Sequence, residues 1–222
     1  RAQDGACEPA VPVFRAALMY TPQHFQPGED GAALEAIARW PLAMLVTDGP
    51  AITHLPMLRE GDALIGHVAA ANDHWKRAAD GAAAVAVFTG PDAYVSPGFY
   101  ASKAEHGRVV PTWNYMAVHV HGVLRWTHDD AEKLQIVRTL TDRFEQRELK
   151  PWSVDDAPPA FMAAMMRGIV GVTLEISRIE AQFKLSQNRT EDDRSGVELG
   201  LTERGAEGED VARLMRAHFR EG

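Results

Sequence analysis

The chain has 222 residues, of which 45% are hydrophobic, so it can form one substantial domain with a buried core. Its net charge of −8 comes from 31 acidic and 23 basic residues, which disfavours a dedicated DNA-binding domain because such domains usually carry a basic footprint. No apolar run approaches the roughly 20 residues that cross a bilayer, so a membrane-spanning helix is excluded.

The first 18 residues are expected to form an irregular extension. Asp4 and Glu8 interrupt any apolar stretch in it, so the segment does not read as a secretory signal. Cys7 is the only cysteine of the chain and therefore has no partner for an intrachain disulfide. These features lead us to expect a protein of the reducing cytoplasm.

Short strands with inserted helices follow along the first half of the chain. Leu34 and Ile37 recur at helical spacing, and the pair Gly49–Pro50 is a hairpin signal between two apolar runs. The predicted elements are a helix over 30–39, two strands joined around Gly49–Pro50, a strand over 63–68, a helix from Asn72 to about Gly81 and a strand over 82–90.

The second half continues in the same style, with a long loop over 93–110 before its first strand. After the loop we predict the longest strand over 112–126, a helix over 129–144, a proline-punctuated connection over 145–160, a short helix over 160–168, a strand over 169–183 and helices in the tail. The order does not alternate regularly between strand and helix. It favours a mainly β fold, a β-barrel with peripheral helices, over a doubly wound parallel sheet.

One candidate site lies where the strand over 63–68 runs through small residues into Asn72. A helix that begins at Asn72 would direct free backbone N–H groups outward, and Lys76 one turn later would add positive charge. This arrangement suits an anion such as a phosphate. The alternative is an ordinary capped helix with a surface lysine.

A second candidate is the strand over 112–126. Its alternation places Met116, Val118, Val120, Gly122 and Leu124 on one face and Ala117, His119, His121, Val123 and Arg125 on the other. Two histidines at this spacing could bind a metal, but a metal site needs a third protein ligand. No Cys- or His-rich segment announces one, unless His54 and His67 on other strands converge on the pair. We therefore expect no metal site, and assign His119 and His121 to sheet packing or a dimer seam. Gly122 marks either a bulge or a place where something lies flat on the sheet.

The third candidate follows the last predicted strand. Thr190 and Asp193 resemble a capping box, so a helix is predicted to begin at Thr190. The acidic first turn of that helix would repel a phosphate, so any contact with an anion should come from Lys184, Gln187 or Arg189 in the preceding loop. The alternative is a polar loop with a good cap.

Several catalytic motifs are missing from the sequence. It has no G-x-S-x-G elbow, no P-loop, no G-x-G-x-x-G after a strand, and no Cys–His pair suited to nucleophilic catalysis. Ser96 is followed by proline and has no helix N-terminus behind it to form an oxyanion hole. No helix-turn-helix is recognisable either.

The chain resembles the PaiB family, whose members are labelled FMN-binding negative transcriptional regulators. The resemblance is carried by MYTPQHF, ITHLPML, GHVAAANDHWK, YVSPGFY, VPTWNYMAVHVHG and GIVGVTLEISRIEAQFKLSQNR, in this order from Met19 to about Leu201. It implies a flavin-binding split β-barrel that assembles as a homodimer and holds FMN at the interface. It also divides the chain into an extension over 1–18, a split-barrel domain over 19–202 and a helical tail over 203–222.

The resemblance implies a set of cofactor-binding residues and defines no catalytic residue. The set is Thr53, His54, Leu55, Asn72, Trp75, Lys76, Thr112, Trp113, Asn114, Lys184, Gln187 and Arg189. Among these, Trp113 and Asn114 are expected to cover the flavin from the partner subunit.

Three functions remain open from the sequence. The first is an FMN-binding transcriptional regulator, for which direct DNA binding is doubtful because the chain is acidic. The second is an FMN-dependent oxidoreductase, which would need few catalytic side chains because the flavin does the redox chemistry. The third is a dimeric binding module without a cofactor.

Overall fold

The computed structural model describes residues 19–27, 30–49 and 51–220, and the structural statements below refer to these residues. The predicted extension over 1–18 lies outside them. A seven-stranded sheet with the order β2-β1-β5-β6-β7-β4-β3 forms the centre, and every neighbouring pair is antiparallel. No described helix is both long and apolar enough to cross a membrane.

The elements follow the predicted order closely. The strands are β1 Leu42–Thr47, β2 Ala51–Pro56, β3 Leu58–Glu60, β4 Ala63–Ala69, β5 Ala83–Val95, β6 Thr112–Thr127 and β7 Ile169–Lys184. The α-helices are α1 Asp30–Arg39, α2 His74–Arg77, α3 Ser102–His106, α4 Asp130–Glu145, α5 Pro159–Arg167, α6 Glu191–Thr202 and α7 Ala206–Arg220. Short 3-10 turns are η1 Gln23–Phe25, η2 Pro97–Phe99 and η3 Val154–Asp156.

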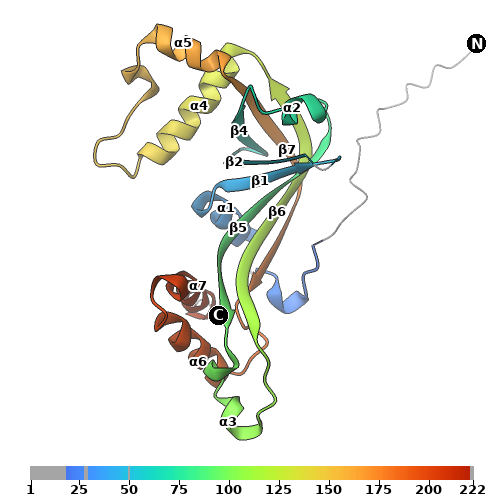
Figure 1. Ribbon diagram of the computed structural model, residues 1–222, viewed down its shortest axis with the longest axis vertical. Coiled ribbons are helices and arrows are strands. Elements are labelled where there is room, and N and C mark those ends of the chain that lie inside the picture. The colour runs from blue at the N-terminus through green and yellow to red at the C-terminus, as the bar shows by residue number, and fades with distance from the viewer. Residues whose placement is uncertain (1–18, 28–29, 50, 221–222) are drawn as a thin grey trace, which may run out of the picture.

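The sheet curls into a split β-barrel. Its two outermost strands, β2 and β3, are consecutive in the chain and are separated only by Met57, so the sheet bends until these edges approach each other. The strands β5, β6 and β7 are much longer than the others and extend beyond the curled part (Figure 1). The predicted mainly β fold with peripheral helices is therefore confirmed.

Alternation along the strands separates an inner face from an outer face. Inner residues such as Leu45, Phe88 and Val118 are fully buried in the main core. Outer residues on the same strands are only partly covered, as the burial patterns of β1 and β5 show. Because side chains alternate with period two, one face of the sheet is fully buried in a single chain, and the other face is only partly buried.

Gly122 sits at a β-bulge between β6 and β7. His121 pairs with Arg178 and Gly122 pairs with Ile176, so Ser177 is the extra residue of β7. A Cβ atom at position 122 would lie 2.1 Å from the carbonyl oxygen of Glu175. Of the two interpretations that the sequence left open, the bulge is therefore the one that the structure supports.

Most of the helices lie at the two ends of the long strands, while α1 lies beside the middle of the sheet (Figure 1). The helices α4 and α5 lie at one end, and α3, α6 and α7 lie at the other (Figure 1). Val211, Ala212 and Met215 of α7 are buried in the main core. The segment predicted as a C-terminal tail therefore packs against the rest of the fold.

Candidate functional site

The predicted cofactor-binding residues form two groups. One group lies near the C-terminal end of β6, and the other lies at its N-terminal end. The upper group is Thr53, His54, Leu55, Asn72, Trp75 and Lys76. The lower group is Thr112, Trp113, Asn114, Lys184, Gln187 and Arg189.

These two groups are far apart within one chain. The upper group adjoins the end of β6, where the indole N–H of Trp126 donates to the carbonyl of Ala78 at 3.0 Å. The lower group begins at Thr112, the first residue of β6. At about 3.3 Å per residue the strand between Thr112 and Trp126 is roughly 45 Å long. A single chain therefore does not bring the two groups together.

A closed network of polar side chains occupies the upper group. The amide of Asn72 donates to Thr53 Oγ1 at 3.1 Å, and Thr53 Oγ1 lies 2.9 Å from His74 Nδ1. The other ring nitrogen of His74 lies 2.9 Å from Thr47 Oγ1. Burial, followed by the nearby Arg77, lowers the pKa of His74. The buried imidazole is therefore held in its neutral form between two hydroxyl groups.

His74 was not among the predicted site residues, although it lies within the stretch GHVAAANDHWK. Its position two residues after Asn72 gave no sign that it would be buried. The His74 side chain is buried because three elements meet around it. Thr47 ends β1, Thr53 lies on β2 and His74 begins α2.

His54 and Leu55 are neighbours of Thr53, but alternation separates their directions. Leu55 is buried in the core with an exposed fraction of 2%, whereas His54 is exposed on the outer face of the sheet. Only alternate residues of β2 can therefore face one pocket.

The prediction of an extended helix from Asn72 to Gly81 is wrong. α2 is a single turn, and Asn72 precedes it and accepts a hydrogen bond from the His74 backbone N–H at 2.9 Å. A helix this short has little dipole to offer an anion. Lys76 is also compensated, since it forms an ion pair with Asp73 at 2.9 Å and lies 5.3 Å from the Trp75 ring.

The lower group contains two cations without carboxylate partners. Lys184 Nζ donates to Thr112 Oγ1 at 2.6 Å, and Arg189 lies 4.5 Å over the ring of Tyr100. Among the described residues, neither cation forms an ion pair. Burial, followed by the positive charge of Arg189, lowers the pKa of Lys184. An ammonium, a guanidinium and a hydroxyl in this arrangement are a suitable donor set for a phosphate.

Trp113 is the exposed aromatic residue of the lower group. Its side chain is 49% exposed, and its ring meets that of Tyr94 edge-on with 6.1 Å between centroids. A flat aromatic surface at the open end of a strand pair suits contact with a planar ligand.

Asn114 and Gln187 are occupied within the chain. Asn114 is fully buried, and its amide donates to Ser186 Oγ at 3.0 Å. The Gln187 side chain accepts from the Leu185 backbone N–H at 2.7 Å and donates to the Phe183 carbonyl. Both amides therefore shape the turn after β7 in the single chain.

His119 and His121 acquire a third neighbour that the sequence analysis did not foresee. Glu180 of β7 is directly opposite His119, and Glu180 Oε2 lies 2.7 Å from His121 Nε2. The sequence offers no Cys- or His-rich segment as the source of a third ligand, and the neighbour that the fold supplies is instead a carboxylate. The missing information was the register of β6 against β7, which the sequence does not contain.

His54 and His67 do not converge on this pair. His54 is three strands away through the sheet order, or about 14 Å at the usual strand spacing. His67 of β4 pairs with Gly171, near the opposite end of β7 from Glu180.

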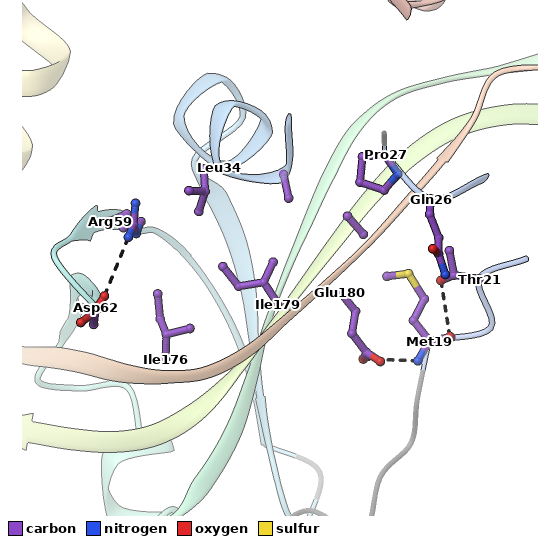
Figure 2. Close-up of a pocket in the computed structure, with 12 residues that line it drawn as sticks. Met19, Thr21, Gln26, Pro27, Leu34, Arg59, Asp62, Ile176, Ile179 and Glu180 are labelled. Atoms are coloured by element: carbon purple, nitrogen blue, oxygen red, sulfur yellow. Dashed lines mark hydrogen bonds and ion pairs between the residues drawn. The ribbon is translucent and has the colours of Figure 1, made fainter. Parts of the chain in front are cut away.

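Two cavities lie elsewhere on the described surface. The first, of about 730 Å³, lies beside β7 and is bordered by Leu34, Ile176, Ile179 and Glu180 (Figure 2). The second, of about 890 Å³, lies between α1 and α7. None of the predicted cofactor-binding residues lines either cavity.

Comparisons with known proteins identify a matching family model, and they find similar proteins in a bacterium and in a fungus. Residues 19–178 match the family model described as "Putative FMN-binding domain". A Bacillus subtilis protein, "Protease synthase and sporulation protein PAI 2", is 33% identical over 173 residues, which cover 75% of this chain and 80% of the relative. An uncharacterized protein of Emericella nidulans is 32% identical over 143 residues, and the match covers 59% of this chain and 57% of that protein.

Solved structures share the fold at low sequence identity. The FAD and heme binding protein from Mycobacterium smegmatis matches with a TM-score of 0.53 and 18% identity, covering 77% of this chain and 78% of that one. The flavocytochrome Anf3 from Azotobacter vinelandii matches with a TM-score of 0.50 and 20% identity, covering 75% of this chain and 73% of that one. At these low identities the structural matches show a common fold and nothing more, and that fold agrees with the split β-barrel described above.

Proposed function

Because this chain belongs to the FMN-binding domain family and is of the PaiB type, we propose that two copies of it join to hold FMN between them. FMN is the cofactor of the family. The location of the flavin and the pairing of the chains are our proposal.

One observation carries the proposal: the two groups of cofactor-binding residues lie at opposite ends of β6. Neither the cavity beside β7 nor the cavity between α1 and α7 is lined by residues of either group. Two copies related by a two-fold axis, with their long strands antiparallel, would place the upper group of one beside the lower group of the other. Such a dimer would hold two equivalent sites.

The outer face of the sheet supports this pairing. Leu42 of β1 and Ile52 of β2 are 61% and 53% exposed, and Val85 and Val87 of β5 are only partly covered. By register, Val46 lies between Ile52 and Val85, and Met44 lies between His54 and Val87, so these strands carry an outer patch that is mainly apolar and includes the exposed His54. A contiguous apolar surface of this kind is typical of an interface between protein chains.

The lower group fits the phosphate of FMN. Lys184, Thr112 and Arg189 would hold the phosphate oxygens, since their two positive charges are uncompensated within the chain. Trp113 would cover the ring system, and Thr53 and Asn72 of the other copy would direct polar groups to its edge. Bound FMN supplies one- and two-electron redox chemistry, while the protein binds and orients it.

The proposal is tested by measuring cofactor and assembly together. FMN titrated into the purified protein should be quenched at one molecule per chain, and sedimentation should show a dimer. A folded monomer that binds FMN stoichiometrically would contradict the proposed interface. A dimer that binds no flavin would favour a binding module without a cofactor.

For the biological role, we propose regulation by a flavin-dependent dimer. The support is the family label and the name of the Bacillus relative, which refers to sporulation. The net charge of −8 makes direct contact with DNA unfavourable at long range. We therefore expect no sequence-specific gel shift at moderate salt. A specific shift with a steep salt dependence would instead establish a direct repressor.

The same acidic charge favours an oxidoreductase as a second candidate, because redox chemistry on bound FMN requires no basic surface. Anaerobic addition of NADH or NADPH to the FMN-loaded protein decides this question. Loss of the flavin absorbance would support an oxidoreductase, and an unchanged spectrum with both nucleotides would contradict it.

A further inference from the structure

His119, His121 and Glu180 form a compact group on the outer face of the sheet. Each offers one ligand atom, and the three atoms lie within 4.8 Å of one another. None of these residues belongs to the cofactor-binding groups described above. His121 is buried, while His119 and Glu180 are partly buried, so the group is partly accessible to solvent.

The β6–β7 register builds this group. His119 and His121 are two residues apart on β6 and therefore project from the same face. Glu180 pairs with His119 across the ladder, which places its carboxylate beside both rings. The bulge lies on the far side of His121, so it does not shift this register. The three side chains are therefore held by regular strands, which makes a more rigid support than a loop.

Two of the ligand atoms are accessible to a new partner. His119 makes a ring contact with His121, at 6.4 Å between centroids, but no hydrogen bond to a described residue. The three described contacts of the Glu180 carboxylate, with His121, Arg178 and Met19, all use Oε2. The second carboxylate oxygen, Oε1, therefore remains available.

Two imidazoles and one carboxylate are a ligand set typical of a divalent transition metal. Zn²⁺ binds such atoms at about 2.0–2.2 Å, so its ligands lie roughly 3.3 Å apart. The present spread of 4.8 Å needs a contraction of about 1.5 Å, which rotation of the side chains can supply. Three protein ligands would leave a fourth position for water or another small ligand.

Arg178 is the group that competes with a metal. Its Nη2 atom lies 3.3 Å from His121 Nε2 and 3.5 Å from Glu180 Oε2, so the guanidinium occupies part of the place that a cation would take. Its side chain is 39% exposed, and its Nε atom is buried without a hydrogen-bond partner. The arginine is therefore partly exposed, and one of its nitrogens lacks a hydrogen bond.

One of the three residues, Glu180, also lines a cavity beside β7. Glu180 borders the cavity of about 730 Å³, where its carboxylate faces the backbone nitrogen of Met19 (Figure 2). From these contacts we propose that His119, His121 and Glu180 bind one divalent transition metal ion of the Zn²⁺ class per chain. None of the three residues belongs to the predicted cofactor-binding set, and on the outer face His119 and His121 lie beside Val87 and Val85 of β5.

Calorimetric titration of the EDTA-treated, gel-filtered protein with ZnCl₂ tests the proposal. We expect one Zn²⁺ per chain, with affinity reduced about tenfold or more by either His119→Gln or Glu180→Gln. His119→Gln is the decisive variant, because the ring makes no hydrogen bond whose loss would endanger folding. Arg178→Gln should strengthen binding, since it removes the competing positive charge.

His106→Gln is the matched control, because His106 is an exposed histidine on α3, away from the group. It should leave the affinity for Zn²⁺ unchanged. Circular dichroism of each variant establishes that the fold is intact. The absence of saturable Zn²⁺ binding to the wild-type protein would overturn the proposal, as would equal affinity in wild type and folded His119→Gln.

Discussion

Lys76 and Lys184 show how surroundings decide what a lysine can do. Both are candidates for a phosphate contact by residue type. Lys76 is exposed and already paired with Asp73, whereas Lys184 is partly buried, bonded to the hydroxyl of Thr112 and near a second cation. An uncompensated positive charge gains more from an incoming anion than a paired one does. We therefore assign the phosphate contact to Lys184.

Replacement of Lys184 by alanine should discriminate between FMN and riboflavin. We expect FMN affinity to fall about tenfold or more, while riboflavin, which lacks the phosphate, binds almost unchanged. Fluorescence quenching measures both affinities. Lys76→Ala is the matched control and should have little effect on either ligand. Equal losses for FMN and riboflavin in Lys184→Ala would show that this lysine contacts the ring or supports the fold.

His74 should make the protein sensitive to acid. Its pKa is lowered in the folded state, chiefly by burial, so the unfolded chain takes up a proton first as the pH falls. The stabilising contribution is complete above the ordinary histidine pKa of about 6.5 and is lost as the pH falls toward the folded value. Burial also lowers the pKa of His67, which adds an effect of the same sign.

Urea unfolding at about pH 7.5 and about pH 5.5 measures this effect. The free energy of unfolding should be lower at the acidic pH. His74→Gln should be less stable than wild type at both values, because it breaks the contacts with Thr47 and Thr53, but its dependence on pH should be shallower. An unchanged pH dependence in this variant would assign the acid sensitivity to other groups.

At the scale of elements, the β6–β7 pair organises most of the molecule. It carries the lower group of predicted cofactor-binding residues at one end and the His119–His121–Glu180 group in the middle. Gly122 allows the bulge between the middle and the other end. The bulge adds one residue to β7, which bends the strand and changes the direction of the residues beyond it. A defect at this point would therefore disturb the ladder on which both groups depend.

Gly122→Ala should destabilise the protein by about 2–4 kcal/mol, because the new methyl group would overlap the carbonyl oxygen of Glu175 and backbone atoms would have to move. Urea unfolding followed by circular dichroism measures the change. Gly31→Ala in α1 is the matched control, since its Cβ would meet nothing within 4 Å. It should be neutral or stabilise by up to about 1 kcal/mol. A neutral Gly122→Ala would contradict the close approach.

The N-cap of α6 forms as its sequence predicts, but a tertiary contact redirects one of the two predicted capping side chains. Thr190 accepts a hydrogen bond from the Asp193 backbone N–H at 3.3 Å, as predicted, and α6 begins at the next residue. The Asp193 carboxylate, however, does not return to the cap. It accepts from the backbone N–H and the hydroxyl of Ser102, both at 2.9 Å. The expected capping box is therefore wrong in its second half, and Asp193 instead joins α6 to α3.

At the scale of the whole molecule, the curled sheet carries exposed apolar side chains on its outer face and has two separated groups of predicted cofactor-binding residues. A single chain fills its inner face with core side chains and leaves Leu42 and Ile52 largely exposed outside. Association through the outer face would cover this surface and complete two sites in one step. Under this proposal the dimer would complete the FMN sites and would also bury apolar surface, which the hydrophobic effect favours.

Mixing two variants tests whether each site uses both chains. Asn72→Ala damages the upper group and Lys184→Ala damages the lower group, so each homodimer should bind FMN poorly. In a mixed dimer one of the two sites combines intact groups, and an equal mixture that exchanges subunits freely should recover about a quarter of the sites. Flavin fluorescence quenching counts them. No recovery despite subunit exchange would place the whole site within one chain.

The sequence by itself determined the elements and the family. The strand over 112–126, the helix over 129–144 and the start of α6 at Thr190 follow from periodicity and capping residues, which act over a few neighbouring positions. The motifs from Met19 to Leu201 were enough to predict the split barrel and FMN, and the family match agrees with both. These signals are local or are carried by residue identity, so they can be read along the chain.

Only the tertiary structure decided which residues meet. The contact of Glu180 with His121 depends on the register of two strands, the burial of His74 on the meeting of three elements, and the separation of the two cofactor-binding groups on the length and direction of β6. Residues 59 positions apart come together at 2.7 Å because backbone pairing aligns them. Pairing and packing depend on the whole chain at once, and no short stretch of sequence encodes them.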